Sequence, residues 1–502
     1  MSTIHSPLYA VIDLGSNSFH MLITRQLANS VQIVDKVKRK VRLASGLDKH
    51  NHLSEDAIAR GLECLRFFAE RLQDIPIQNV RIVATATVRI ATNQAEFLKQ
   101  ANKVLGQNIR VLTGIEEASY IYQGVAYTSY GESNRLVFDI GGASTEIIVG
   151  QNTNANKVIS LNIGCVIFNK RYFSDQQLND KNFQQAVDAA KQLITPFVSE
   201  FKSIGWQKVL GGSGTMQALS EVLMFQRKPA LITTSFLHDI KQKLITYQRF
   251  DAIDIDGLTS ERKPVFASGV AILIALFECF NITQLQLSSG ALREGLLYEM
   301  LPDNQKVDLR QRTINSLMEK CHVDQPHANN ILAQAQQLYA SFSSSWALTD
   351  DNGLALLTAA CQLHEIGLLL AFKHHQQHSA YIIEHSQLPG FDQADKQLLC
   401  ALVTMYNADI DPQLLTLQSA CDFQTACYLL AIIRIAVILC RRRKDDVLPV
   451  YQSSATNNEI TLCLPKAWLT LHPLIADELI QENDHLKAIG LSLKVHSPNI
   501  SK

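Results

Sequence analysis

The sequence predicts an α/β fold with a duplicated N-terminal half, followed by an all-α domain and a small α+β domain at the C-terminus. The first observation behind this prediction is a polar turn between two apolar runs, which occurs twice, in residues 11–23 and 136–149. Two copies of one hairpin indicate two related half-domains that face each other. The second observation is that later apolar strands also run through glycine-rich turns into helices. The third is that long stretches of helical period replace this alternation beyond residue 301.

The length and composition agree with several globular domains. A chain of 502 residues is too long for one ordinary core, and its hydrophobic content of 47% is typical of a globular protein. We expect the two half-domains, the helical domain and the terminal domain to span residues 1–125, 126–305, 306–447 and 448–502. The net charge of −1 gives no electrostatic reason to expect a nucleic acid or a membrane as partner.

The cysteines and the apolar stretches favour a reduced, cytoplasmic compartment. The ten cysteines contain no C-x-x-C pair, so neither a disulfide framework nor a zinc ribbon is indicated. The N-terminus lacks the layout of a signal peptide. The most apolar stretches, 265–280 and 426–440, contain Glu278 and Arg434 and are too short to span a membrane, which predicts buried core helices.

The first half-domain continues with a basic strand and a helix. Residues 36, 38, 40 and 42 are all Lys or Arg and share one face of the expected strand, which either meets a polyanion or protects a solvated edge. Ser54 then opens an amphipathic helix that ends near residue 75.

Two further strands lead to the carboxylates of the first half-domain. Residues 80–86 predict a strand that continues through Thr85 to Arg89, whose hydroxyls and guanidinium could contact an anion. A strand at 109–112 leads into the turn of Glu116 and Glu117, which begins a helix. Carboxylates at a helix N-terminus are ordinarily favourable to the helix dipole, so either Glu taken singly is read as structural.

The second half-domain contains two more glycine turns. After a helix over residues 179–200, residues 210–216 form a glycine-rich turn whose backbone N–H groups can hold an anion. The turn lacks the G-K-[ST] ending of a Walker loop. Residues 285–295 repeat the order of strand, glycine turn and helix.

The C-terminal part carries several histidines. The adjacent pair His364-Glu365 is followed by His374, His375 and His378, of which residues four apart share a helix face. Without a complete ligand set, these histidines are expected on helix surfaces rather than in a metal site. Residues 459–464 and the helix around Trp468 predict the small terminal domain.

The two hairpins suggest a site for a phosphate chain with Mg²⁺. Their turns can donate N–H and hydroxyl hydrogen bonds to phosphate oxygens. We expect Asp139 to hold the metal, and Asp13 to reach it directly or through water, because Mg²⁺ keeps several waters and few carboxylates. Glu146, seven residues after Asp139, is a further ligand or orients a water. These residues alone do not supply a base for the attacking water.

Five segments resemble, in order, the signature turns of the exopolyphosphatase and guanosine pentaphosphate phosphohydrolase family. They are residues 13–18, 114–118, 139–146, 212–215 and 289–295, and the resemblance extends over essentially the whole chain. It implies an actin-like (ribonuclease H-like) duplicated half, which accounts for the twin hairpins. Residues 38–44, 84–87, 122–126 and 468–474 look more like the guanosine pentaphosphatase branch.

The resemblance also implies roles for residues. It makes Glu117 the general base, and neighbouring helix residues point about 100° apart, so Glu116 cannot face the same water. It makes Asp139 and Glu146 metal ligands. The residues expected to bind phosphate are Ser16, Asn17, Ser18, Arg89, Gly142, Ala143, Ser144, Gly212, Ser213, Gly214, Thr215 and Arg293.

The resemblance finally implies a function and an assembly. It predicts a Mg²⁺-dependent hydrolase that converts guanosine pentaphosphate into guanosine tetraphosphate in the stringent response. Alternatives are an exopolyphosphatase, an actin-like sugar kinase and a non-catalytic regulator that binds the nucleotide. The helical part is similar to HD-type phosphohydrolases, but His364-Glu365 stands where such a site has His and Asp. We expect this part to supply homodimer contacts and a basic groove rather than a second active site.

Overall fold

The computed structural model divides the chain into two compact units, residues 1–309 and 310–502. It describes residues 7–27, 30–129, 131, 133–301, 309–444 and 448–497. The predicted boundaries at 305/306 and 447/448 lie outside these residues, and the boundary at 125/126 stays a prediction.

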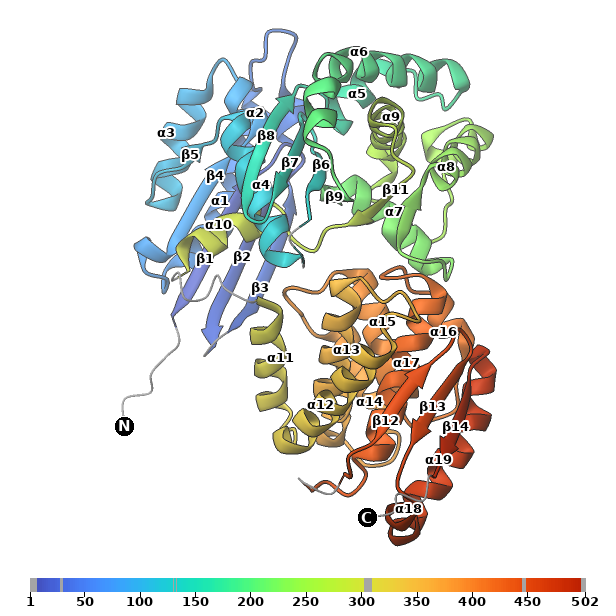
Figure 1. Cartoon of the computed structure of the whole chain (residues 1–502). Coiled ribbons are helices and arrows are strands. Elements are labelled where there is room, and N and C mark those ends of the chain that lie inside the picture. Colours follow the sequence, from blue (N-terminus) through green and yellow to red (C-terminus); the bar gives the residue numbers. More distant parts are fainter. Residues whose placement is uncertain are drawn as a thin grey trace. The chain divides into compact units, whose positions relative to one another are not determined.

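The first half of the N-terminal unit is a five-stranded sheet in the order β3-β2-β1-β4-β5 (Figure 1). Its strands are β1 (Leu8–Leu14), β2 (Ser18–Leu27), β3 (Ser30–Lys40), β4 (Val80–Ala84) and β5 (Arg110–Val111). The central strand β1 is almost wholly buried, as expected for an apolar run, and pairs antiparallel with β2 and parallel with β4. Helices α1 (Glu55–Leu72) and α3 (Gln94–Leu105) pack against one face of this sheet in a shared core.

The second half repeats this topology in a six-stranded sheet in the order β10-β11-β9-β6-β7-β8. Its strands are β6 (Arg135–Ile140), β7 (Thr145–Gln151), β8 (Asn154–Leu161), β9 (Lys208–Gly212), β10 (Leu231–Thr233) and β11 (Gln284–Leu287). The strands β6, β7 and β8 form an antiparallel meander, and β9 pairs parallel with β6, as β4 does with β1. The predicted duplication of the N-terminal half is therefore confirmed.

The helices of the second half pack around a buried helix. They are α5 (Cys165–Tyr172), α6 (Asp180–Ile204), α7 (Ser213–Phe225), α8 (Thr234–Tyr247) and α9 (Lys263–Phe280). Among the described helices, α9 alone is long and apolar enough to cross a membrane, but 72% of its apolar window is buried inside the protein. It is the core helix that the sequence predicts.

A central layer of two helices joins the halves. Helices α4 (Gly114–Thr128) and α10 (Leu292–Met300) share a core with residues of both sheets, among them Val11 and Val137. A Cβ at Gly124 would collide with the backbone of α10, and one at Gly295 with the backbone of α4. The two helices are therefore in direct backbone contact, which only glycine allows at these positions.

The C-terminal unit combines helices and a three-stranded sheet around one core. The helices are α11 (Leu309–Lys320), α12 (Gln325–Phe342), α13 (Asp351–Leu363), α14 (His375–His385), α15 (Gln393–Met405), α16 (Pro412–Thr416), α17 (Phe423–Leu439), α18 (Lys466–Leu471) and α19 (Pro473–Leu486). The strands are β12 (Gln452–Ala455), β13 (Glu459–Cys463) and β14 (Ser492–His496). Helix α17 is buried along nearly its whole length, as predicted.

One local prediction is wrong. The strand expected to continue through Arg89 ends at Ala84, and Thr85 precedes a short helix, α2 (Ala86–Ile90). The pairing of β4 with β1 also ends at Ala84, so the chain beyond it has no ladder to extend. Short 3₁₀ turns span η1 (Leu43–Gly46), η2 (Ile77–Asn79), η3 (Phe250–Ala252), η5 (Ile366–Leu369) and η6 (Lys487–Ile489).

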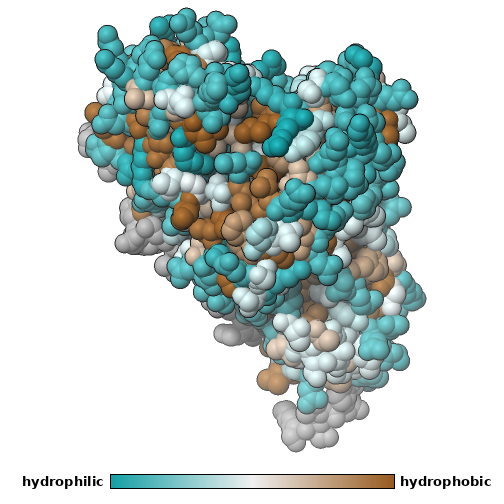
Figure 2. Space-filling model, turned by 90° about the horizontal axis from the view of Figure 1, so that it is seen from above, coloured by the Kyte–Doolittle hydropathy of each residue, from teal (hydrophilic) through white to brown (hydrophobic). Residues whose placement is uncertain are grey.

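The surface and the cysteines fit the composition. Hydrophilic residues cover much of the face shown in Figure 2, with hydrophobic residues gathered mainly toward its middle. All ten cysteines are free thiols.

Candidate active site

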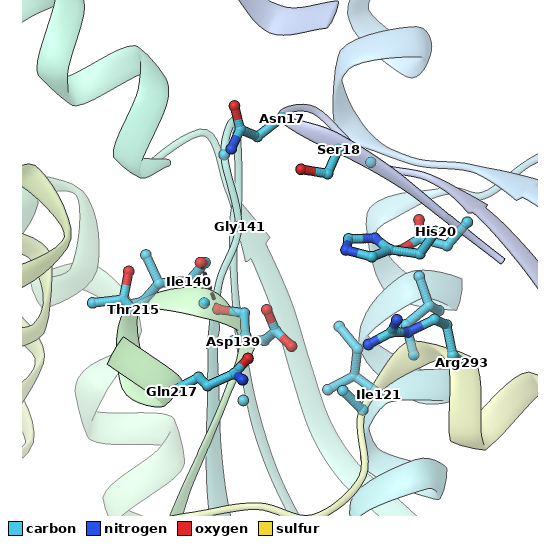
Figure 3. A pocket seen from close by; sticks show the side chains of 18 of the residues that line it. Asn17, Ser18, His20, Ile121, Asp139, Ile140, Gly141, Thr215, Gln217 and Arg293 are labelled. Atoms are coloured by element: carbon cyan, nitrogen blue, oxygen red, sulfur yellow. Dashed lines mark hydrogen bonds and ion pairs between the residues drawn. The ribbon is translucent and has the colours of Figure 1, made fainter. Parts of the chain in front are cut away.

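The signature turns of the two halves meet at one pocket of about 520 Å³ in the N-terminal unit. Most of the predicted site residues line it, namely Asp13, Ser16, Asn17, Ser18, Glu117, Asp139, Gly142, Ser144, Gly212, Ser213, Gly214, Thr215 and Arg293. Figure 3 shows Asp139, Thr215 and Gln217 on one side, with His20 and Arg293 facing them from the other. The fold therefore brings together turns that are far apart in the sequence. Ala143, Glu146 and Arg89 do not line the pocket.

The duplicated hairpins place matching rows of side chains at this pocket, although Glu146 and Ser160 of the second row do not line it. In the first half, strand pairing aligns Asp13 with His20, and His20 with Lys38. The equivalent row in the second half aligns Asp139 with Glu146, and Glu146 with Ser160. One copy thus combines its acid with cationic or neutral groups, whereas the other combines two carboxylates with a hydroxyl.

The two hairpin turns also touch each other. A Cβ on Gly142 would lie 2.9 Å from the Cβ of Ser16. A second close approach joins Gly212 to Asp139, whose Oδ2 would be 2.7 Å from a Cβ at residue 212. Ser213 follows with a φ of 67°, a left-handed conformation that is uncommon for a residue with a side chain, and its hydroxyl donates to the Ile140 carbonyl at 2.6 Å. These glycines let two turns and a carboxylate crowd around one space.

The pocket wall holds a concentration of buried carboxylates. Burial, with Glu117 as the next cause, raises the pKa of Asp139 to about 7. Burial and the neighbouring Asp139 raise the pKa of Glu146 to about 7 as well, although Ser160 donates a 2.7 Å hydrogen bond to Glu146. Burial and Glu146 raise the pKa of Glu117 well above its ordinary value. The carboxylates therefore repel one another in the absence of a bound cation.

A capping box separates the two glutamates of α4. Thr113 accepts a hydrogen bond from the Glu116 backbone, the Glu116 carboxylate returns to the Thr113 N–H at 2.8 Å, and Arg110 also binds Glu116. Glu117 points elsewhere, to the pocket, and its side chain is only 9% exposed. The expectation that the two side chains diverge is met.

Arg89 holds the Glu117 carboxylate. Its Nη1 donates to Glu117 Oε2 at 2.8 Å and to the Leu112 carbonyl at 2.7 Å. The predicted contact of Arg89 with a phosphate stays a prediction, because in this structure the guanidinium is engaged at the back of the pocket wall.

Only part of the predicted basic face of β3 lines the pocket. Lys36 and Lys38 on β3 line the pocket, whereas Lys40 lies 3.5 Å from Glu261. The inclusion of Arg42 in this face is wrong, because β3 ends at Lys40 and Arg42 has a left-handed φ of 52°. The pocket also contains Arg262, from the N-terminal end of α9.

Comparison with protein families assigns nearly all of the chain. Residues 22–304 match the Ppx/GppA phosphatase family, and residues 309–483 match domain III of the Ppx/GppA phosphatases. The chain belongs to the Ppx/GppA phosphatase family. The family prediction is therefore confirmed.

Curated relatives of the Ppx/GppA family match over almost their full length. A guanosine-5'-triphosphate,3'-diphosphate pyrophosphatase of Pseudoalteromonas translucida is 47% identical, over 97% of this chain and 98% of the relative. A protein of the same name from Photobacterium profundum is 46% identical, over 97% of this chain and 98% of the relative.

Solved structures confirm the actin-like fold of the Ppx/GppA half. An exopolyphosphatase of Cytophaga hutchinsonii matches with a TM-score of 0.54 and 22% identity, over 58% of this chain and 97% of its own. An exopolyphosphatase-like protein matches with a TM-score of 0.53 and 22% identity, over 59% of this chain and 98% of its own. At these identities the likeness concerns the fold alone.

Sequence reasoning missed three pocket residues of this Ppx/GppA protein. His20 could have been found, because a tight hairpin that starts at Asp13 aligns the two across the strands, and their side chains lie 3.7 Å apart. No sequence pattern indicated that Arg262 and Gln217 line the pocket, since each reaches it from a helix whose placement depends on the tertiary fold.

The buried carboxylates predict an unusual pH dependence of stability in metal-free protein. Because the pKa of Glu146 is about 7 in the folded protein and 4.5 ordinarily, the folded state binds the extra proton between these values, and stability falls as pH rises through that range. We expect Glu146→Gln to be more stable than the unsubstituted protein by about 1–3 kcal/mol at pH 8. At pH 5 the two should be equal.

Chemical denaturation in EDTA at both pH values measures this difference. Glu200→Gln, which changes an exposed glutamate paired with Lys157, is the control for a nonspecific effect of lost charge. Equal stabilities of Glu146→Gln and the unsubstituted protein at pH 8 would contradict the prediction.

Proposed function

We propose that the protein hydrolyses the terminal 5′-phosphate of guanosine pentaphosphate, giving guanosine tetraphosphate and phosphate. The names of the curated relatives support this substrate. The observation that carries the proposed chemistry is the position of Glu117, a buried carboxylate at the wall of a pocket that is lined by glycine- and serine-containing turns. A raised pKa suits a group that takes up a proton near neutral pH.

Glu117 is proposed to accept the proton of the attacking water. Its partner Arg89 fixes the orientation of the carboxylate at one oxygen, Oε2. The other oxygen is then available to the water. A positioned general base of this kind contributes about 10²–10⁴-fold in rate.

The turns of the two halves are proposed to hold the phosphate chain. Ser16, Asn17 and Ser18 donate from one half, and the turns at Gly142–Ser144 and Gly212–Thr215 donate from the other. Arg293 lies across the pocket from Asp139, where its charge can neutralise phosphate oxygens (Figure 3). Lys38, beside His20 on the paired strand, adds positive charge from the first half.

The carboxylates fit a Mg²⁺ ion. Magnesium prefers oxygen ligands, and the pocket offers Asp139 with Glu146 behind it. Asp13 Oδ1 is buried without a hydrogen-bond partner among the described residues, so it can serve as a further ligand, directly or through water. Bound Mg²⁺ would neutralise the charge of the phosphate groups and of the carboxylates.

Phosphate release separates this function from its alternatives. We expect release from guanosine pentaphosphate, dependent on Mg²⁺ and without an acceptor alcohol, with a kcat/KM at least about tenfold above that for long-chain polyphosphate. The measurement is phosphate release from both substrates in parallel, with Mg²⁺ and with EDTA. A preference for polyphosphate would favour the exopolyphosphatase alternative, and a strict need for an acceptor would favour a kinase.

The proposed function includes a homodimer in the cytoplasm. Free thiols at all ten cysteines agree with a reducing compartment. Light scattering of the full chain at micromolar concentration measures the oligomeric state, and a monomer mass of 56.0 kDa would reject the dimer.

A further inference from the structure

The C-terminal unit contains a second cluster of potential metal ligands. His327 on α12 lies beside His364 and Glu365, which follow α13, and one ligand atom of each lies within 4.8 Å of the others. Both histidines are buried, at 5% and 1% exposure. The adjacent pair His364-Glu365 can be recognised in the sequence, but the third member of the cluster, His327, comes from another helix.

The histidines predicted as a group do not form this cluster. His375 is satisfied by its neighbours, since Nδ1 lies 2.8 Å from the Phe372 carbonyl and Nε2 lies 2.6 Å from the Tyr406 hydroxyl. His374 precedes α14 with a left-handed φ of 60° and is exposed. The expected place on a helix surface is therefore wrong for the buried His375, whereas His378 lies partly exposed on α14 and His374 is exposed just before the helix.

The imidazole of His364 is prepared to act as a ligand. Its Nδ1 donates to the Cys361 carbonyl at 2.8 Å, so Nε2 carries the lone pair and faces Glu365 Oε1 at 4.0 Å. A hydrogen bond of this kind from the second ring nitrogen orients the ligating histidines of metal sites. Tyr406 packs edge-on against the same ring at 4.8 Å.

His327 is left with an unmet hydrogen bond. Its Nδ1 is buried and has no hydrogen-bond partner among the described residues. Buried polar atoms are nearly always paired, so an unpaired nitrogen on a histidine of this cluster calls for an explanation. A bound cation would supply one.

Arg443 occupies the carboxylate of the cluster. Its guanidinium binds Glu365 Oε1 and lies 3.6 Å from Asp324 Oδ2. The backbone of Arg443 has a left-handed φ of 50°, a costly conformation for a residue with a side chain. The positive charge of Arg443 therefore balances Glu365, and the ion pair between them holds the Arg443 side chain in place.

We propose that His327, His364 and Glu365 bind one transition-metal ion of the zinc class, and that Arg443 pairs with Glu365 when the metal is absent. Two imidazoles and one carboxylate suit Zn²⁺ or Co²⁺ better than Mg²⁺. Three protein ligands leave a coordination position open to water or to an anion. The metal and the guanidinium compete for one carboxylate, so each weakens the binding of the other. The site lies in the C-terminal unit and is independent of the function proposed for the pocket.

Metal content of the full chain tests the site. Protein stripped with EDTA is dialysed against Zn²⁺ or Co²⁺ in excess Mg²⁺, which is added to fill the pocket carboxylates that we propose bind Mg²⁺. We expect one equivalent in the unsubstituted protein, a visible Co²⁺ absorption band, and loss of both in His327→Phe. The control His472→Phe changes a histidine that stacks on Trp468 outside the cluster and should retain the metal. Equal metal content in His327→Phe and the unsubstituted protein would overturn the site.

A matched pair of arginine variants tests the competition. Arg443→Gln should bind Zn²⁺ at least about tenfold more tightly, because it removes the competing charge. Arg442→Gln changes the neighbouring arginine, which contacts His472, and should leave the affinity unchanged. Equal affinities in the two variants would overturn the role of Arg443. If His327→Phe fails to fold by circular dichroism, Glu365→Gln removes the third ligand at a less buried position and is expected to lose the metal as well.

Discussion

Glu117→Gln is expected to lower the turnover of guanosine pentaphosphate by about 10²–10⁴-fold, the usual contribution of a positioned base. Glutamine fills the same space and can still accept a hydrogen bond from Arg89, but it cannot take a proton from water. The loss should appear in kcat rather than in KM, because the turns that hold the phosphates are unchanged. Steady-state phosphate release measures both constants.

Glu116→Gln is the matched control for this prediction. It changes the adjacent residue, whose carboxylate caps α4 and binds Arg110 outside the pocket. We expect it to keep turnover within about threefold and to lose about 1 kcal/mol of stability from the weakened cap. Normal phosphate release from Glu117→Gln, or an equal loss in both variants, would reject Glu117 as the base.

Arg434→Met is expected to destabilise the C-terminal unit by about 3–5 kcal/mol, because it leaves the buried Glu482 without a counter-ion. Arg434 on α17 donates to both carboxylate oxygens of Glu482 on α19, at 2.6 and 2.8 Å. It also donates to the Ala408 carbonyl at 2.6 Å. Both side chains are less than 5% exposed. Urea denaturation followed by circular dichroism measures the change.

The double variant Arg434→Met/Glu482→Leu separates the buried charge from the loss of packing. Replacing a buried ion pair by apolar residues is often close to neutral, so the second substitution should restore about half of the lost stability or more. Arg441→Met, which removes a partner of the partly exposed Glu478, should cost less than about 1 kcal/mol. A small effect of Arg434→Met alone would contradict the prediction.

The hairpins of the N-terminal unit could be predicted because their information is local. An acid, a glycine and small hydroxyl residues between two apolar runs specify a turn without reference to the rest of the chain. Strand alternation then fixes which residues share a face, so Asp139 and Glu146 could be expected as neighbours. The spacing of Thr113 and Glu116 also fits a capping box, a pattern that was not used to predict either role and that distinguishes the structural glutamate from Glu117.

Other features depended on contacts between distant segments. Where β3 ends decides that Lys38 reaches the pocket and Arg42 does not, and this end is set by pairing with β2. His327 joins His364 only because α12 packs on α13 in the folded unit. Arg89 meets Glu117 because a short helix replaces the expected strand end. The local sequence pattern does not indicate these contacts between distant segments.

The glycine contact between α4 and α10 limits which distances in the pocket could change if the two halves closed on each other. Glu117 lies at the start of α4 and Arg293 at the start of α10, so two helices in backbone contact carry the proposed base and a proposed phosphate ligand. Helices this close cannot slide without a collision. The separation of Glu117 and Arg293 should therefore stay constant when the sheets tilt. The turns around Ser16 and Ser213 would move instead, so closure would bring the phosphates to a stationary base.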